Sequence, residues 1–347
     1  MESSAGRDEI HSKEGAMKNN VMRCFLYIAL IAPVAEAQQF SEWSVPVNLS
    51  QINSVSDEQH PAISKDGLSL YFASNRPGGC GGTDIWVAQR ASLDSPWEAP
   101  FNLGCTVNSN ANDLGPNLTT DGHRLFFHSF RSGGCGGGDI YYTDRKNRRD
   151  DLGWDVPRNL NTFGRDPDAS LVCGAIGSSF LVNTPNTDAG PNSFNEEATG
   201  AMILYFTRSN QPTMVGDFDI YTAVLTSDGV WGEVTKVNEL STTPYRDTRT
   251  AIRRRDGLEM ILSSERPGGF GGDPRDLWFS TRANTADPWS IPGLLPNVNS
   301  TANDGGPALS WDATELFFTS ARAGGMGGTD IYVSTRTKVT GNVADQQ

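Results

Sequence analysis

The stretch PAISKDGLSLYFASNRPGG occupies residues 61–79, and GGTDIW follows at residues 81–86. Its last part recurs as an Asp followed by an aliphatic and an aromatic residue: Asp84-Ile85-Trp86, Asp139-Ile140-Tyr141, Asp219-Ile220-Tyr221, Asp276-Leu277-Trp278 and Asp330-Ile331-Tyr332. A short apolar run precedes each copy: residues 70–72, 125–127, 204–206, 260–262 and 316–318. Aromatic-rich runs bounded by Gly, Pro and Asp are typical of β-strands, so the chain is expected to be all-β and built from five repeats.

A third repeated element is a Trp that opens a further strand: Trp43, Trp97, Trp154, Trp231 and Trp289. The first of these precedes any complete repeat, whereas no Trp follows the last repeat. We therefore expect the segment from Trp43 to Leu49 to pair beside the strand containing residues 330–333, in the last repeat. This offset predicts a single five-bladed β-propeller with four antiparallel strands per blade, closed by its N-terminal strand so that no sheet edge stays exposed.

The ends of the chain differ from the repeats in composition. Residues 1–37 read as an upstream extension plus a signal peptide, with Met17 as the expected start, an apolar run at residues 25–34 and cleavage after Ala37. The run is too short for a membrane span, which predicts a periplasmic or secreted protein. The propeller is expected at residues 38–338, with an insertion near 162–181 and a polar tail at 339–347.

The charge and histidine content exclude several classes of function. The chain has 41 acidic and 28 basic residues and a net charge of −13, which argues against nucleic acid or an anionic membrane as a partner. The expected mature chain holds only His60, His123 and His128, without metal-ligand spacing, so neither a metal nor another cofactor is expected. A monomer is the favoured oligomeric state.

Four cysteines follow the expected signal peptide: Cys80, Cys105, Cys135 and Cys173. Three pairings are formally possible, and four free thiols are the alternative. In each of the first two blades, one Cys lies on the loop between the second and third strands and the other on the connection leaving the same blade. This shared placement predicts the disulfides Cys80–Cys105 and Cys135–Cys173 in an oxidising compartment.

An acidic residue precedes the first strand of every blade: Glu58, Asp113, Asp188, Asp247 and Asp304. Near the end of the second strand, four blades carry an Arg: Arg76, Arg131, Arg266 and Arg322. In the third blade this position is occupied by Asn210. One interpretation is that these residues form a ligand-binding ring around the top of the channel. The other is structural, with each Arg paired to the Asp that opens the third strand. Gly-rich tracts such as residues 78–82 are expected to be tight turns, because no phosphate-loop Lys or helix follows them.

The stretches 61–79 and 81–86 resemble the TolB-type, WD40-like propeller repeats of bacterial envelope proteins. The resemblance covers roughly residues 40–337 and implies the fold and, commonly, a binding platform. It does not specify a chemistry, because one fold hosts unrelated functions.

Two functions are compatible with these patterns. The first is an exported, non-enzymatic module that binds an envelope protein, a peptide or a glycan at an acidic funnel, favoured by the regularity of the ring. The alternative is a glycan-active enzyme, either a glycoside hydrolase or a polysaccharide lyase, favoured by the available carboxylates and by the asymmetry of the third blade.

Overall fold

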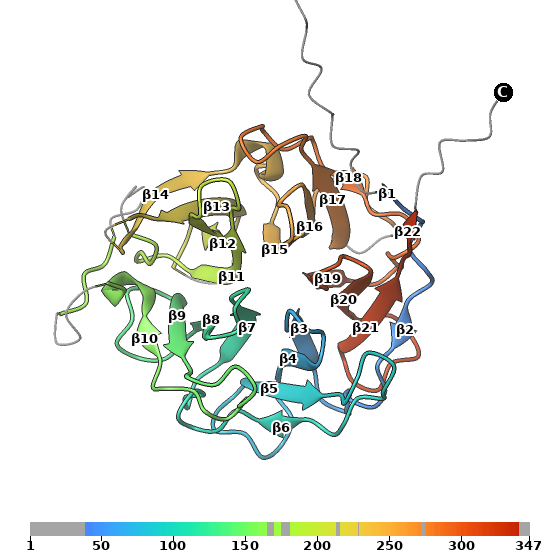
Figure 1. Ribbon diagram of the computed structural model, residues 1–347, viewed down its shortest axis with the longest axis horizontal. Coiled ribbons are helices and arrows are strands. Elements are labelled where there is room, and N and C mark those ends of the chain that lie inside the picture. The colour runs from blue at the N-terminus through green and yellow to red at the C-terminus, as the bar shows by residue number, and fades with distance from the viewer. Residues whose placement is uncertain are drawn as a thin grey trace, which may run out of the picture. The chain divides into compact units, whose positions relative to one another are not determined.

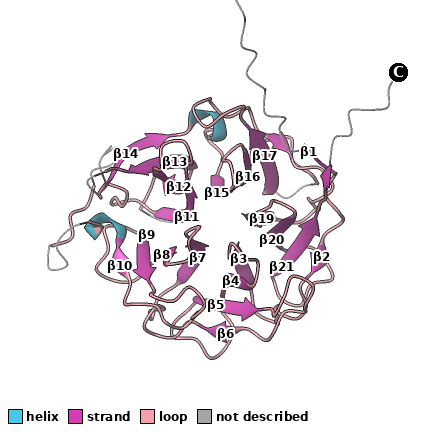
Figure 2. Cartoon of the chain, viewed as in Figure 1, coloured by secondary structure: helices cyan, strands magenta, loops and turns pink. Residues whose placement is uncertain are grey.

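The computed structural model describes residues 39–164, 170–174, 181–212, 216–227, 229–271 and 275–339. This part forms five four-stranded antiparallel sheets around a central opening, which confirms the expected five-bladed propeller (Figure 1). Among these described residues, two short 3-10 helices interrupt the strands, η1 (Leu160–Thr162) and η2 (Asn238–Leu240) (Figure 2). The expected signal peptide, parts of the expected insertion and the tail beyond residue 339 lie outside the described residues.

Each blade runs from an innermost first strand to an outermost fourth strand. Blade 1 contains β3 (Glu58–Ile63), β4 (Ser69–Ser74), β5 (Asp84–Gln89) and β6 (Phe101–Asn102). Blade 2 contains β7 (Asp113–Leu118), β8 (Arg124–Ser129), β9 (Asp139–Asp144) and β10 (Arg158–Asn159). Blade 3 contains β11 (Asp188–Asn195), β12 (Met202–Ser209), β13 (Phe218–Leu225) and β14 (Trp231–Lys236). Blade 4 contains β15 (Asp247–Ile252), β16 (Glu259–Ser264), β17 (Asp276–Thr281) and β18 (Gly293–Leu294).

Blade 5 is completed by the N-terminal part of the chain. It contains β19 (Asp304–Leu309), β20 (Glu315–Ser320), β21 (Asp330–Thr335) and, as its outer strand, β2 (Val47–Asn48). Val47 pairs with Val333 and Asn48 with Tyr332, which confirms the predicted closure. A second antiparallel pair, β1 (Gln39–Phe40) with β22 (Lys338–Val339), adds to the same join.

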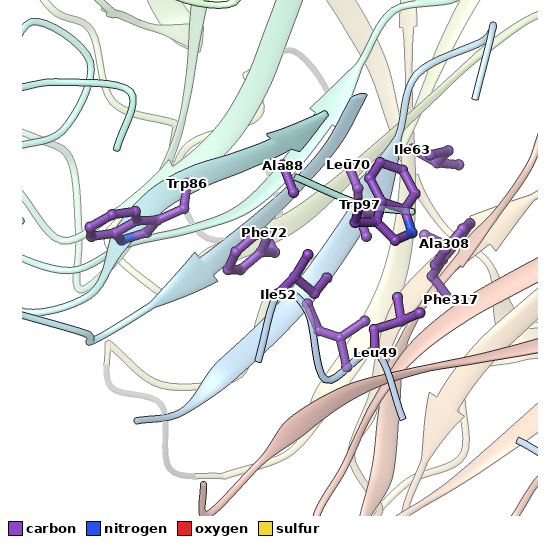
Figure 3. Packing of buried hydrophobic residues seen from close by; sticks show 11 residues of the cluster. Leu49, Ile52, Ile63, Leu70, Phe72, Trp86, Ala88, Trp97, Ala308 and Phe317 are labelled. Carbon is purple, nitrogen blue, oxygen red and sulfur yellow. The ribbon is translucent and has the colours of Figure 1, made fainter. Parts of the chain in front are cut away.

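The apolar cores lie between neighbouring blades. The cluster between blades 5 and 1 packs Leu70 and Phe72 of β4 against Phe317 of β20, with Leu49 and Ile52 of the N-terminal segment between them (Figure 3). These five side chains are buried, and each contributes roughly 1.5–3 kcal/mol. Because the aromatic run of every second strand faces such an interface, the repeat itself holds the ring closed.

The predicted Trp residues are buried, but four of them lie just before the outer strand rather than inside it. In these four blades an Arg at the end of the third strand stacks over the indole, at 4.3 Å for Trp43, 4.5 Å for Trp97, 4.3 Å for Trp154 and 4.3 Å for Trp289. Cation–π stacking therefore fixes the outer edge of each of these blades, where β2, β6, β10 and β18 are only two residues long.

Candidate functional site

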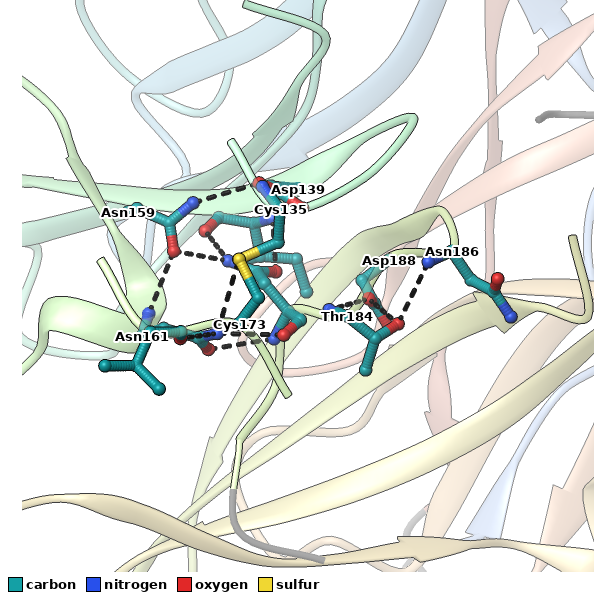
Figure 4. The surroundings of a disulfide bond; sticks show 11 residues. Cys135, Asp139, Asn159, Asn161, Cys173, Thr184, Asn186 and Asp188 are labelled. Carbon is teal, nitrogen blue, oxygen red and sulfur yellow. Dashed lines mark hydrogen bonds between the residues drawn. A yellow bond between two sulfur atoms is a disulfide. The ribbon is translucent and has the colours of Figure 1, made fainter. Parts of the chain in front are cut away.

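The five predicted acidic residues are fully buried at the start of the innermost strands. Each accepts a bond from a guanidinium: Glu58–Arg76 at 2.8 Å, Asp113–Arg131 at 2.7 Å, Asp188–Arg208 at 2.6 Å, Asp247–Arg266 at 2.6 Å and Asp304–Arg322 at 2.7 Å. Each also accepts bonds from the loop that precedes its strand, as Asp188 does from the backbone N–H and the hydroxyl of Thr184 (Figure 4). The contacts of these acids are therefore made within the blades.

The predicted pairing of Arg with the Asp that opens the third strand is wrong. Asp84 instead accepts bonds from the backbone N–H of Cys80 and from the Asn102 amide, so this Asp fastens the Gly-rich loop. A side chain on Gly79 would collide with the Asp84 carboxylate, which explains the Gly at that place. All nine predicted ring residues make such contacts within the protein, and their assignment as ligand contacts stays a prediction.

Blade 3 departs from the predicted pattern. The guanidinium that meets Asp188 belongs to Arg208, which lies inside β12, and not to the position of Asn210. Asn210 instead donates through its side-chain amide to Asp217 at 3.2 Å. The alignment of the repeats did not identify Arg208, because its long side chain reaches the Asp188 carboxylate from a different position along the second strand.

Both predicted disulfides are confirmed. The Cα atoms are 5.5 Å apart in Cys80–Cys105 and 5.3 Å apart in Cys135–Cys173. The second bridge lies beside Asn159 and Asp139, and it ties the connection leaving blade 2 to the Gly-rich loop of that blade (Figure 4). Disulfides of this kind persist in oxidising compartments, which is consistent with export.

A pocket of about 470 Å³ opens where the innermost strands begin, at the end of the channel that we call the top. Its described lining includes Arg246, Arg249 and Arg275, together with His60 and His128. Apolar rings of phenylalanine form another part of the wall, and no carboxylate is present among the described lining residues. Within the part of the chain that the structure describes, the predicted acidic funnel is therefore replaced by a basic pocket.

The innermost strand of each blade has a bulge, and the residue at the bulge has a positive φ. Blades 2, 3 and 5 place a glycine there, at φ values of 61° for Gly115, 61° for Gly190 and 58° for Gly306. Blades 1 and 4 place His60 at 54° and Arg249 at 47°. A side chain in this left-handed region costs roughly 1–2 kcal/mol, so these two residues are held against the backbone preference that the other blades satisfy with Gly.

Arg249 spans the channel toward both histidines. Its Nη2 donates to Nδ1 of His60 at 3.1 Å and approaches Nδ1 of His128 at 3.5 Å. A Cβ on Gly115 would lie 2.0 Å from Nη1 of Arg249, so the absence of a side chain there makes room for the guanidinium. Because guanidinium can only donate, both Nδ1 atoms are acceptors and both imidazoles are neutral.

The electrostatics of the pocket favour an anion. Burial, together with Arg275, lowers the pKa of Arg249 to about 9. Burial, and after it the charge of Arg249, holds the pKa of His60 and of His128 well below 6.5. Among the described residues, Arg275 pairs with Glu265 at 3.0 Å, whereas no carboxylate pairs with Arg249. An enclosed cation without a counter-ion is a strong reason to expect an anionic ligand.

Sequence reasoning missed these residues, although a signal was present. In the aligned repeats DLGP, DAGP and DGGP, the third residue is Gly, whereas EQHP and DTRT carry His60 and Arg249. His128 comes from the second strand of another blade, and nothing in the sequence predicts its contact with Arg249.

We expect the stability of the protein to fall as the pH drops below about 6.5. The pKa of His60 in the folded protein lies below 6.5, so between pH 6.5 and that lowered pKa the unfolded chain binds more protons than the folded chain. The stabilisation from neutral His60 is therefore fully present above pH 6.5 and is lost as the pH falls toward the lowered pKa. Urea unfolding at a series of pH values should show a smaller decline for His60→Asn than for the parent protein. His123→Asn, the same replacement at an exposed position, is measured alongside as a comparison. Equal declines for the parent and His60→Asn would contradict this expectation.

No family model matches the chain, and no curated protein matches it. Among solved structures, the catalytic domain of a GH62 α-L-arabinofuranosidase from Coprinopsis cinerea is 12% identical with a TM-score of 0.53, covering 87% of this chain and 98% of that one. An α-L-arabinofuranosidase from Lactobacillus brevis is 13% identical with a TM-score of 0.54, covering 85% and 95%. An endo-arabinase from Bacteroides thetaiotaomicron is 16% identical with a TM-score of 0.52, covering 86% and 99%.

These likenesses show the five-bladed fold and correct the first functional expectation. A non-enzymatic module with an acidic funnel is wrong, because the similar structures are glycoside hydrolases and the described pocket lining carries no carboxylate. The resemblance to TolB-type repeats gains no support from these comparisons beyond the propeller architecture. No helix among the described residues is long and apolar enough to cross a membrane. No group of three or more His, Cys, Asp or Glu residues in the described ranges could hold a metal ion.

Proposed function

We propose that the protein is a glycan-active enzyme that cleaves a uronate-containing polysaccharide by β-elimination in the top pocket. The observation that carries this proposal is the arrangement of Arg249, an enclosed guanidinium without a carboxylate partner, against two neutral imidazoles. Its distance to Nδ1 of His60 is 3.1 Å. A uronate supplies the missing negative charge, and the half-buried Phe130 offers apolar surface to the sugar ring.

Hydrolysis by paired carboxylates has less support. Glycoside hydrolysis in most families needs two carboxyl groups on either side of the scissile bond. The described lining of the pocket carries none, and the nearby acids of the blades are already bonded to arginines. A lyase needs a different set of groups, namely a cation for the uronate carboxylate and a neutral base.

Substrate binding and base activation are coupled in this arrangement. The substrate carboxylate would take the Nη2–H of Arg249 that His60 now accepts, with Arg246 and Arg275 adding positive charge at the wall. The His60 Nδ1 lone pair would then be free to accept the C5 proton. The lowered pKa keeps this imidazole unprotonated at neutral pH, which is the state that a base requires.

The bond changes follow from these roles. His60 takes the C5 proton, and the charge that develops on the uronate carboxylate is stabilised by Arg249. The electron pair left on C5 forms the C4–C5 double bond as the C4–O bond breaks. The leaving oxygen takes up a proton from water, and His60 later releases its proton to water, so the products are one unsaturated chain end and one new hydroxyl-bearing end.

We further propose that this enzyme works outside the cytoplasm, in the periplasm or the surrounding medium. The two disulfides support this, because such bridges are rare in reducing compartments. Large acidic polysaccharides are also substrates that a cell meets outside its membrane. A monomer is sufficient for the proposed chemistry, since every group named above comes from one chain.

The test is an assay of the purified chain with pectate, alginate and hyaluronan as acidic polysaccharides, and with arabinan and xylan as mostly neutral ones. We expect an acidic polysaccharide to give ultraviolet absorbance from the unsaturated product in step with new reducing ends. New reducing ends without that absorbance would indicate hydrolysis and contradict the proposal. Cleavage restricted to arabinan or xylan would contradict it as well.

A further inference from the structure

A second, smaller cavity lies in the channel below Arg249. It has a volume of about 30 Å³ and is walled by all five innermost strands. Arg249 borders both this cavity and the top pocket. Arg254 borders this cavity and a surface hollow lined by the turns at the opposite face. The cavity is therefore bordered by two arginines, one toward each face of the ring.

The charge of Arg254, like that of Arg249, has no carboxylate partner among the described residues. Its side chain is buried, with an exposed fraction of 6%, and it donates to the carbonyl oxygens of Leu118 at 3.0 Å and Ile63 at 2.8 Å. Burial lowers the pKa of Arg254 to about 10. In the described ranges no carboxylate pairs with Arg254, so neither of the two arginines that border the cavity has a carboxylate partner there.

Thr250 supplies an independent sign of a missing ligand. It lines the cavity, its exposed fraction is 6%, and its buried hydroxyl has no hydrogen-bond partner among the described residues. Buried hydroxyl groups are normally bonded, so an orphan beside a cavity points to an occupant. The other titratable group at this cavity is His60, and its described wall carries no carboxylate.

We propose that this cavity binds a small monovalent anion of the halide type, such as chloride, between Arg249 and Arg254 with the Thr250 hydroxyl as a donor. An anion offsets positive charge that no described carboxylate neutralises, whereas a metal cation would add to that charge. Space for a water needs only about 10–15 Å³ by the same kind of measure, so the cavity admits a small ion but excludes a sugar. The proposal does not depend on the lyase chemistry.

The direct test is crystallisation of the full chain in bromide, followed by measurement of anomalous scattering at the bromine edge. We expect a peak in the cavity within contact distance of the Thr250 hydroxyl and both guanidinium groups. Density for water without an anomalous signal would overturn the proposal. A bromide peak confined to the top pocket would overturn it equally, because that pocket has arginines of its own.

The solution test compares melting temperatures in chloride and in gluconate at equal ionic strength. Because an anion that binds only the folded chain stabilises it by mass action, chloride should raise the melting temperature by about 2 °C in a saturating manner. Thr250→Val should lose most of this shift. Thr187→Val is the matched control, since Thr187 also has a buried hydroxyl without a partner in the described residues but lies outside the cavity lining. Equal shifts in the two variants, or no shift in the parent protein, would overturn the proposal.

Discussion

Replacement of Arg249 by Met should lower kcat/KM on the acidic polysaccharide by about 10²–10³, the usual loss when one donor to a developing oxyanion is removed. Met keeps the length of the side chain but supplies neither charge nor donor. Arg249→Lys keeps the charge and should recover part of the rate, because an ammonium cannot match the planar geometry of a guanidinium. The measurement is initial rate from the ultraviolet absorbance of the unsaturated product.

The repeats supply a control for this loss. Three blades have Gly where blade 4 has Arg249, and their backbones adopt the same left-handed conformation. Arg249→Gly should therefore fold with a melting temperature no lower than that of the parent protein, while its rate falls as far as that of Arg249→Met. An unchanged rate in either variant would show that Arg249 does not meet the substrate. A large drop in melting temperature would show instead that Arg249 holds the ring together.

Asp113→Ala should lower the free energy of unfolding by about 3–5 kcal/mol, because it leaves Arg131 without its partner in a buried place. Asp113 is fully buried and its carboxylate lies 2.7 Å from the Arg131 guanidinium. It also accepts bonds from the backbone N–H and the hydroxyl of Ser109, so the substitution frees several donors at once. The measurement is equilibrium unfolding in urea.

Two comparisons isolate the ion pair in this result. The double variant Asp113→Leu with Arg131→Met should regain much of the lost free energy, since no uncompensated charge then remains. Lys338 pairs with Asp312 at 3.4 Å in an exposed position, and Lys338→Met should change the free energy of unfolding by about 1 kcal/mol or less. A loss of similar size for Asp113→Ala and Lys338→Met would contradict the structural role of the buried acids.

The same experiment bears on the predicted ligand-binding ring. If Asp113 acts only within its blade, variants that retain the fold should keep their affinity for the substrate. A variant that folds normally but binds the polysaccharide less tightly would support the ligand-contact prediction.

Much of the architecture could be predicted from the sequence, because it depends on local patterns that are repeated in every blade. The Asp of Asp84-Ile85-Trp86 and its four counterparts, and the aromatic run before each, mark strands that pair with sequence neighbours. The offset of Trp43 predicted the long-range pairing of β2 with β21, since the last repeat lacks the outer strand that the other repeats supply from their own sequence. The disulfide pairing followed because both cysteines of each bridge lie on loops of one blade.

The assembly of the site depends on the tertiary structure, although the sequence marks His60 and Arg249 as departures from the repeated Gly. His60, His128 and Arg249 come from three different blades, and only closure of the ring brings their side chains to one point of the channel. The sequence alone determined that acids and arginines recur at fixed places, but not which acid each Arg meets. Arg76 could reach either Asp84 or Glu58, and the fold chose Glu58, because that carboxylate is buried beside the guanidinium while Asp84 fastens a loop. The repeated pattern closes the ring, whereas the proposed catalytic residues His60 and Arg249 lie in the two blades that depart from the repeated Gly.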